Sequence, residues 1–245
     1  MLVEACVDSV ESAIAAERGG AGRLELCDDL HDGGTTPSAG MIAAVKEAVA
    51  MPVFVIVRPR GGGFVYSDAE LDVMRRDIEA AARLGANGIV LGVLTRQAEI
   101  DAERTRRLLG VAPALEVTFH RAFDLVRDRY VALEALVSLG IRRVLTSGGA
   151  AAALEGADAI ARLVGQSSGR LAVMAGGGVR EENVAELVRR TGVSEVHVRG
   201  TRLARTAMTP VNERVRFRKA MPEDEAAWEA TDESRIREIV RLASL

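Results

Sequence analysis

The first candidates for chemistry are polar residues at the end of one strand-like stretch. Residues 115–120 alternate apolar and polar side chains, and the polar set ends in His120. Such alternation is typical of a strand with two different faces. Arg121 and Asp124 follow at once. Burying His, Arg and Asp is costly without partners, so we predict a site here, with His120 as acid–base group and Arg121 and Asp124 contacting substrate.

Eight short strand patterns recur along the 245 residues, and helical patterns fill the gaps. The strand patterns cover residues 2–7, 23–27, 53–58, 88–93, 115–120, 143–147, 171–175 and 195–199. The helical patterns cover residues 9–17, a stretch from Pro37, then 67–85, 100–109, 128–139, 151–165, 181–190 and 232–242. This alternation predicts an α/β fold, a single (β/α)8 TIM barrel formed by residues 1–245 as one domain. Residues 207–228 match neither pattern and are expected to form an irregular excursion before the last helix.

Two local signals refine this scheme. Ser67 followed by Glu70 is a capping box and predicts a helix start. Pro37 suits the first position of another helix.

The rival architecture, an open doubly wound sheet, usually has a glycine-rich loop after its first strand. Here the turn at residues 6–9 has no glycine, which favours the barrel.

The strand faces predict which side chains point into the barrel. The uniformly apolar face of each strand should face the helices, so the other face points inward. This rule places inside the barrel Glu4, Cys6, Glu25, Cys27, Phe54, Ile56, Arg58, Glu116, Thr118, His120, Glu195, His197 and Arg199. (β/α)8 barrels keep their sites at the carboxyl ends of the strands. We therefore predict catalytic roles for Glu4, Glu25, Arg58 and His120, with the two glutamates paired through Arg58 or His197, and a substrate contact for His197.

Cys6 and Cys27 are the only two cysteines, and the first two strands are neighbours in a closed barrel. Thiolates are soft ligands that suit Cu(I), so the pair is a candidate copper site. Buried cysteines also act as small apolar residues, and that interpretation stays open. His120 and His197 are alternative ligands. No His-x-x-x-His or Cys-x-x-Cys pair signals a zinc site.

Glycine-rich turns follow the sixth and seventh strand patterns. The first contains Ser147, Gly148 and Gly149, and the second contains Gly176, Gly177 and Gly178. Backbone N–H groups in such turns bind phosphate in many barrels. Glycine also simply permits tight turns. Both interpretations stay open, and the first makes these residues candidates for substrate binding.

Composition narrows the partners. The net charge is −3 and aromatic residues make up 3%, which disfavours nucleic-acid binding. The longest apolar run, residues 48–57, contains Pro52 and is too short to cross a bilayer. The N-terminus shows no signal-peptide pattern. We expect a cytoplasmic protein whose partner is a copper ion or a small anionic ligand, with no nucleic acid and no membrane; assembly as a homodimer or homotetramer stays open.

Several ordered motifs resemble the CutC family of copper homeostasis proteins, over about residues 2–201. They are residues 4–9 (EACVDS), 23–27 (RLELC), 33–38 (GGTTPS), 58–62 (RPRGG), 118–124 (TFHRAFD), 146–149 (TSGG) and 174–179 (MAGGGV). The resemblance implies a (β/α)8 barrel and a role in copper handling and copper binding. One departure is Arg199, which follows His197 where small residues are common in the family.

Two functions are thus expected. The first is a cytosolic Cu(I)-binding copper homeostasis protein, with copper as its cofactor or cargo. The second is a TIM-barrel enzyme that acts on a small phosphorylated or carboxylated metabolite, with His120 as acid–base group. In the second, Arg58 and the glycine turns hold the anion.

Overall fold

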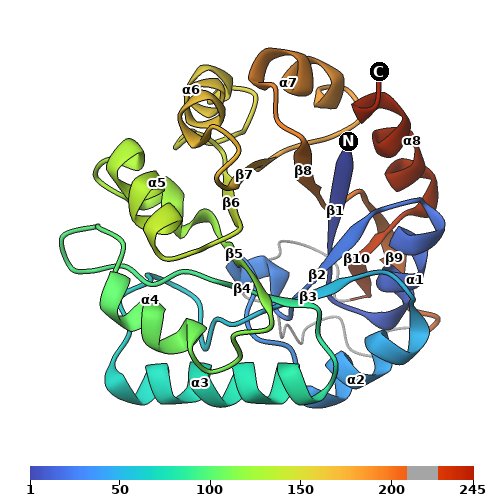
Figure 1. The fold of residues 1–245 in the computed structure, drawn as a ribbon. Coiled ribbons are helices and arrows are strands. Elements are labelled where there is room, and N and C mark those ends of the chain that lie inside the picture. The colour runs from blue at the N-terminus through green and yellow to red at the C-terminus, as the bar shows by residue number, and fades with distance from the viewer. Residues whose placement is uncertain (209–225) are drawn as a thin grey trace.

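The computed structural model describes residues 1–208 and 226–245. Within them, eight parallel strands close into a barrel in sequence order, with helices around the outside (Figure 1). The strands are β1 (Leu2–Val7), β2 (Arg23–Leu26), β3 (Val53–Ile56), β4 (Gly88–Leu91), β5 (Glu116–Phe119), β6 (Arg143–Thr146), β7 (Ala172–Gly176) and β8 (Glu195–Val198). The predicted (β/α)8 barrel is confirmed; that the whole chain forms one domain stays a prediction.

The helices surround this barrel. They are α1 (Val10–Arg18), α2 (Ala39–Ala48), α3 (Asp68–Arg83), α4 (Ala102–Leu109), α5 (Arg129–Ser138), α6 (Ala157–Ser167), α7 (Val184–Thr191) and α8 (Glu233–Ala243), with short 3-10 helices η1 (Leu30–Asp32) and η2 (Arg121–Leu125). The capping box at the start of α3 is confirmed. The Ser67 hydroxyl accepts from the Glu70 amide, and the Glu70 carboxylate accepts from the Ser67 amide.

Four helix starts lie two or more residues after the predicted positions. Helix α4 begins at Ala102 instead of residue 100, because the Asp101 side chain caps it by accepting from the Arg104 amide. Helix α2 begins at Ala39 instead of Pro37, because the Ser38 hydroxyl caps it by accepting from the Met41 amide. Helix α6 begins six residues later than the predicted start at residue 151. The preceding residues are held in a loop in which the Ala153 amide donates to the Gly177 carbonyl. Helix α7 begins at Val184, after a turn in which the Arg180 amide donates to the Asn183 side chain.

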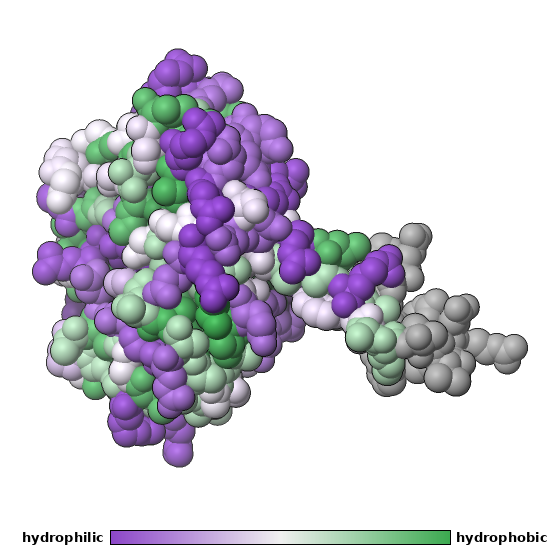
Figure 2. All heavy atoms as spheres, turned by 90° about the vertical axis from the view of Figure 1, so that its right-hand side faces the viewer, coloured by the Kyte–Doolittle hydropathy of each residue, from purple (hydrophilic) through white to green (hydrophobic). Residues whose placement is uncertain are grey.

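An antiparallel ribbon of β9 (Thr201–Arg205) and β10 (Ala227–Thr231) precedes α8. The prediction of an irregular excursion at residues 207–228 is wrong for Ala227 and Trp228, which lie in β10. Residues 209–225 lie outside the described residues. The Thr231 amide donates to the Ser12 hydroxyl and ties the ribbon to α1. In a space-filling view, a small part of the described chain projects from one side of the barrel body (Figure 2).

Two apolar clusters show which way the strand residues face. The larger cluster lies between the barrel and the helices and includes Val3, Val55 and Val196. The smaller one fills part of the barrel interior and consists of Cys6, Cys27, Phe54, Ile56 and Val90, with Leu30 against it. The alternation of the two faces therefore has the predicted parity, and both cysteines point inward.

Candidate functional site

A cavity of about 840 Å³ opens at the carboxyl ends of the barrel strands. We call it the mouth cavity. Its wall is formed by residues of several strand ends and the loops that follow them, including Cys6, Glu25, Arg58, His120, Arg121, Asp124, Gly177, Gly178, His197 and Arg199. Most of the predicted site residues therefore line one space, where barrels of this kind place their chemistry.

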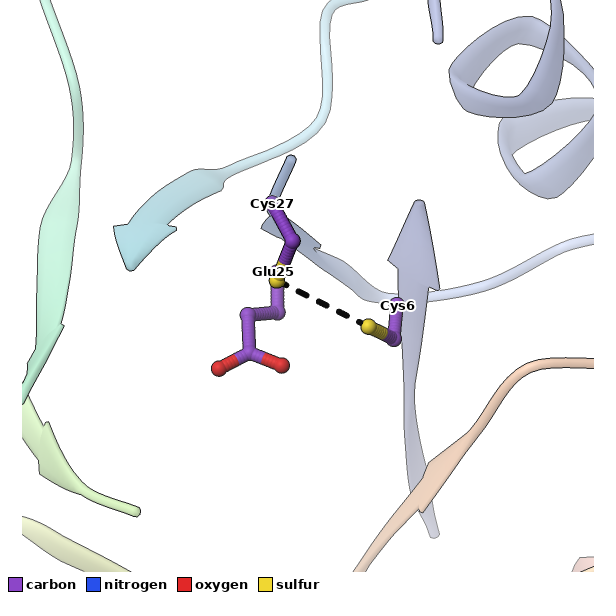
Figure 3. A group of neighbouring side chains, drawn as sticks. All are labelled: Cys6, Glu25 and Cys27. Atoms are coloured by element: carbon purple, nitrogen blue, oxygen red, sulfur yellow. Dashed lines mark hydrogen bonds between the residues drawn. The ribbon is translucent and has the colours of Figure 1, made fainter. Parts of the chain in front are cut away.

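The two cysteines meet inside the barrel, where Cys6 lines the mouth cavity and Cys27 is buried beside it. Cys6 lies in β1 and Cys27 directly follows β2, and both are free thiols that are almost fully buried. Their Sγ atoms are 3.7 Å apart, and Glu25 lies beside them (Figure 3). The hydrogen bond with Cys27 lowers the pKa of Cys6 well below its usual value, despite burial, and a hydrogen bond with His197 adds to this. The same contact and burial raise the pKa of Cys27, so one thiol of the pair loses its proton more readily than the other.

His197 connects the thiols to two carboxyl groups. Its Nδ1 lies 2.8 Å from Oε1 of Glu4, and its Nε2 lies 3.6 Å from Oε2 of Glu25. Burial lowers the pKa of His197, but contacts with Cys6 and Glu4 raise it well above its usual value. Burial raises the pKa of Glu4, but the hydrogen bond with His197 and the charge of Arg23 bring it to about 2. His197 is therefore a cation paired with the Glu4 carboxylate.

Glu25 behaves differently from Glu4. Burial and the negative charge of Cys6 raise the pKa of Glu25 well above its usual value. A neutral Glu25 makes its contact with His197 a polar contact and not an ion pair. The expected pairing of the two glutamates is thus confirmed through His197 for Glu4 and is wrong for Arg58.

Arg58 is held by loop carbonyls instead of by carboxylates. Its Nη1 donates to the carbonyls of Asp32 and Gly34, both at 2.7 Å, and its Nη2 donates to the Gly62 carbonyl at 3.0 Å. The long side chain leaves the strand end and reaches the loops above the barrel. Arg58 therefore fixes the walls of the mouth cavity, and most of its donors are not available to an anion.

We expect Arg58→Met to lower the free energy of unfolding by about 2 kcal/mol, because the buried carbonyl of Gly34 and the carbonyls of Asp32 and Gly62 lose their donors. Urea unfolding followed by circular dichroism measures this loss. The matched control is Arg106→Met, at an exposed position on α4. Equal stabilities of the two variants would show that the carbonyl contacts of Arg58 contribute nothing.

His120 is buried and lies on the wall of the mouth cavity. Its Nδ1 accepts from the Ala122 amide at 3.2 Å, and its ring packs on Phe64 with centroids 4.9 Å apart. Burial and the nearby Arg58 cation lower the pKa of His120 to about 3. So low a pKa does not suit an acid–base group that works near neutral pH, and the role predicted for His120 stays an unsupported prediction.

Asp124, predicted to contact substrate, organises the loop after β6. Its carboxylate accepts from the Thr146 hydroxyl at 2.5 Å and from the amides of Ser147 and Gly149 at 3.0–3.1 Å. The Gly148 amide donates to the Thr146 hydroxyl. The first glycine turn is thus occupied by the protein's own oxygen atoms, which leaves no amides there for a substrate anion.

The second glycine turn is not filled in this way. Gly176 lies in β7, where a Cβ atom would stand 2.5 Å from Leu145 and 3.0 Å from His197, so glycine is needed there for packing. Gly177 and Gly178 follow with φ angles of +110° and +68°. Arg121 lies against Gly177, since its Nη1 is 3.3 Å from the place of a Cβ atom.

Below the cysteines, a buried ion network closes the barrel; we call Glu4, Arg23, Arg143 and Glu195 the floor network. Arg23 pairs with Glu4 and Glu195, and Arg143 pairs with Glu195. Both guanidinium groups also lie over the Phe54 ring. The sequence analysis did not name Arg23 or Arg143. The parity of β2 carried the signal for Arg23, two positions before Glu25. Glu116, at the start of β5, is exposed.

Arg199, the departure from the family pattern, pairs with Glu229 of β10 at 2.8 Å between Nη2 and Oε2. This pair joins the end of β8 to the ribbon beside the mouth cavity.

Among the described residues, no helix has the length and apolar character to cross a membrane.

Comparisons with known proteins give a consistent result. Residues 1–202 match the model of the CutC family. The chain is 46% identical to the copper homeostasis protein cutC homologs of Mus musculus and Homo sapiens, over 99% of this chain and 89% of each relative. The crystal structure of CutC from Streptococcus agalactiae is 37% identical, with a TM-score of 0.78 over 80% of this chain and 97% of that one. A thiamine phosphate pyrophosphorylase from Pyrococcus furiosus, 15% identical with a TM-score of 0.62 over 99% of this chain and 95% of that one, shares the fold alone. The chain therefore belongs to the CutC family.

Proposed function

We propose that this protein binds Cu(I) between the sulfur atoms of Cys6 and Cys27, as part of copper homeostasis. The observation that carries the proposal is the 3.7 Å approach of two free, buried thiols, of which Cys6 lines the open mouth cavity. Thiolates are the soft ligands that select Cu(I) over harder metal ions. The names of the mouse and human relatives support the same function.

The charges around the thiols fit this ion. Metal binding requires both thiols to lose their protons, and the lowered pKa of Cys6 makes the first of these protons easier to lose. Two thiolates and one Cu(I) ion together carry a charge of −1. The His197 cation, which contacts Cys6, offsets this charge inside the barrel.

The neighbouring oxygen and nitrogen donors are committed elsewhere. Both ring nitrogens of His197 face carboxyl groups, and Glu25 is neutral beside Cys6. A closed zinc site takes four ligands in a tetrahedral arrangement. A two-sulfur site therefore suits Cu(I) better than zinc. The cytoplasmic location and the dimeric or tetrameric state stay predictions.

The test is a titration of reduced protein with Cu(I), without oxygen and against a chelating competitor. We expect Cys6→Ser and Cys27→Ser each to weaken binding at least tenfold, because each removes one soft ligand. His31→Ala, which changes an exposed residue of η1, is the control and should bind like the parent. If both serine variants bind Cu(I) as tightly as the parent, the cysteines are not copper ligands and act only as small apolar residues of the core.

A further inference from the structure

The mouth cavity contains hydrogen-bond donors that no group of the protein accepts. Arg121 donates through Nε to Asp124 and through Nη2 to Ser147, both at 2.8 Å. Among the described residues, its Nη1 has no acceptor. This nitrogen lies beside Gly177, and the Arg121 side chain is 42% exposed. A cation in this position can meet a ligand without breaking its own contacts.

The turn beside Arg121 adds backbone donors. In the part of the chain that the structure describes, the amides of Gly177 and Gly178 donate to no protein acceptor. Successive amides in such a turn form concavities that bind anions. The contrast with Gly149, whose amide is taken by Asp124, shows that only the second glycine turn is open to a ligand.

His120 supplies a further, independent donor. Because its Nδ1 accepts from the Ala122 amide, the neutral ring carries its proton on Nε2. That Nε2 is buried and has no partner among the described residues, and His120 lines the same cavity. Buried donors without acceptors are rare and costly, so an oxygen atom of a ligand is the natural partner.

The ionic balance of the cavity wall is also positive. Arg121, Arg199 and Arg235 are paired with Asp124, Glu229 and Glu181. Within residues 1–208 and 226–245, Arg58 and Arg180 have no carboxylate partner at ion-pair distance. Uncompensated cations on a concave wall attract anions.

We propose that the mouth cavity binds a small organic molecule through a phosphate or carboxylate group, held by Nη1 of Arg121 and the amides of Gly177 and Gly178. The ligand extends toward His120, whose Nε2–H donates to a second oxygen atom. This site is separate from the thiol pair and does not need copper. In this proposal Arg121 binds the anion, and Arg58, for which that role was predicted, does not.

The test uses copper-free full-length protein, with inorganic phosphate and acetate as separate probes. Ligands that bind only the folded state raise the melting temperature. We expect at least one probe to raise it at millimolar concentration. The anion that acts at lower concentration identifies the preferred group. In a 1H–15N spectrum, the same probe should shift the amides of Gly177 and Gly178 more than that of Gly149.

Variants then locate the site. Arg121→Met should weaken binding of the active probe at least tenfold, and Arg121→Lys should recover part of it. Arg106→Met removes the same charge from the outer surface and should leave the affinity unchanged. The proposal is overturned if neither anion moves the melting temperature or the two amides, or if Arg121→Met binds as Arg106→Met does. If Arg121→Met does not fold, the amide shifts in the parent decide. Because copper is absent, neither outcome bears on the thiol site.

Discussion

Arg23→Met is expected to lower the free energy of unfolding by about 3–5 kcal/mol, because it breaks a buried ion network by removing one partner. The side chains of Arg23 and Glu4 are 4% and 1% exposed, so water cannot replace the lost contact. Glu195 also loses one of its two cations. Chemical denaturation at neutral pH measures the change.

The control for this prediction is Arg107→Met. Arg107 pairs with Glu103 on the surface of α4, where both side chains are more than 70% exposed. Exposed pairs contribute about 0–1 kcal/mol. If both variants lose a similar amount of stability, the buried ion pairs of Arg23 contribute no more to the free energy of unfolding than an exposed pair does.

The same network predicts how acid acts on the fold. The pKa of Glu4 is about 2 in the folded protein, against the ordinary value of 4.5 for a glutamate. A carboxyl group with a lowered pKa stabilises the fold at pH values above its unfolded pKa. That contribution is lost as the pH falls from 4.5 toward 2, and its size is about 3 kcal/mol. Between pH 6 and pH 2, the parent should therefore lose more stability than Glu4→Gln, in which this carboxyl group is absent.

Asp124→Ala is expected to lower the free energy of unfolding by about 3 kcal/mol. The Asp124 side chain is 7% exposed and accepts from two hydroxyls, those of Thr146 and Ser147, and from two backbone amides at the end of β6 and in the loop that follows. Each buried donor left without an acceptor costs about 1–3 kcal/mol. Urea unfolding measures the total, and the amide of Gly149 should exchange faster with solvent.

Asp128→Ala is the matched control, because Asp128 accepts from two amides at the exposed start of α5. Loss of such a helix cap costs about 1 kcal/mol. If Asp124→Ala is no more harmful than Asp128→Ala, the loop does not depend on the Asp124 carboxylate.

Strand periodicity predicted the barrel and the inward direction of Cys6, Cys27 and Glu25, because side chains in a strand alternate strictly between two faces. The rule also places Arg23 inside, but it says nothing about which carboxylates a guanidinium group will reach. Its pairing with Glu195 joins β2 to the distant β8. That contact depends on closure of the barrel.

Loop conformation decided what periodicity could not. Arg58 starts at a strand end, but its partners are carbonyls of two loops. The low pKa of His120 follows from its burial and the nearby Arg58. Asp124 finds amides more than 20 residues away. None of these distances is encoded in local spacing, so the roles given to Arg58, His120 and Asp124 were the ones that needed correction.

The floor network determines from which end of the barrel an ion can reach the cysteines. Charged side chains and Phe54 close the barrel below Cys6, while the opposite end is open to solvent. An ion that reaches the sulfur atoms therefore enters and leaves through the open end of the barrel. If Cu(I) binds the thiols as proposed, loading and release of the ion both take place at this end, and the ion does not pass through the barrel.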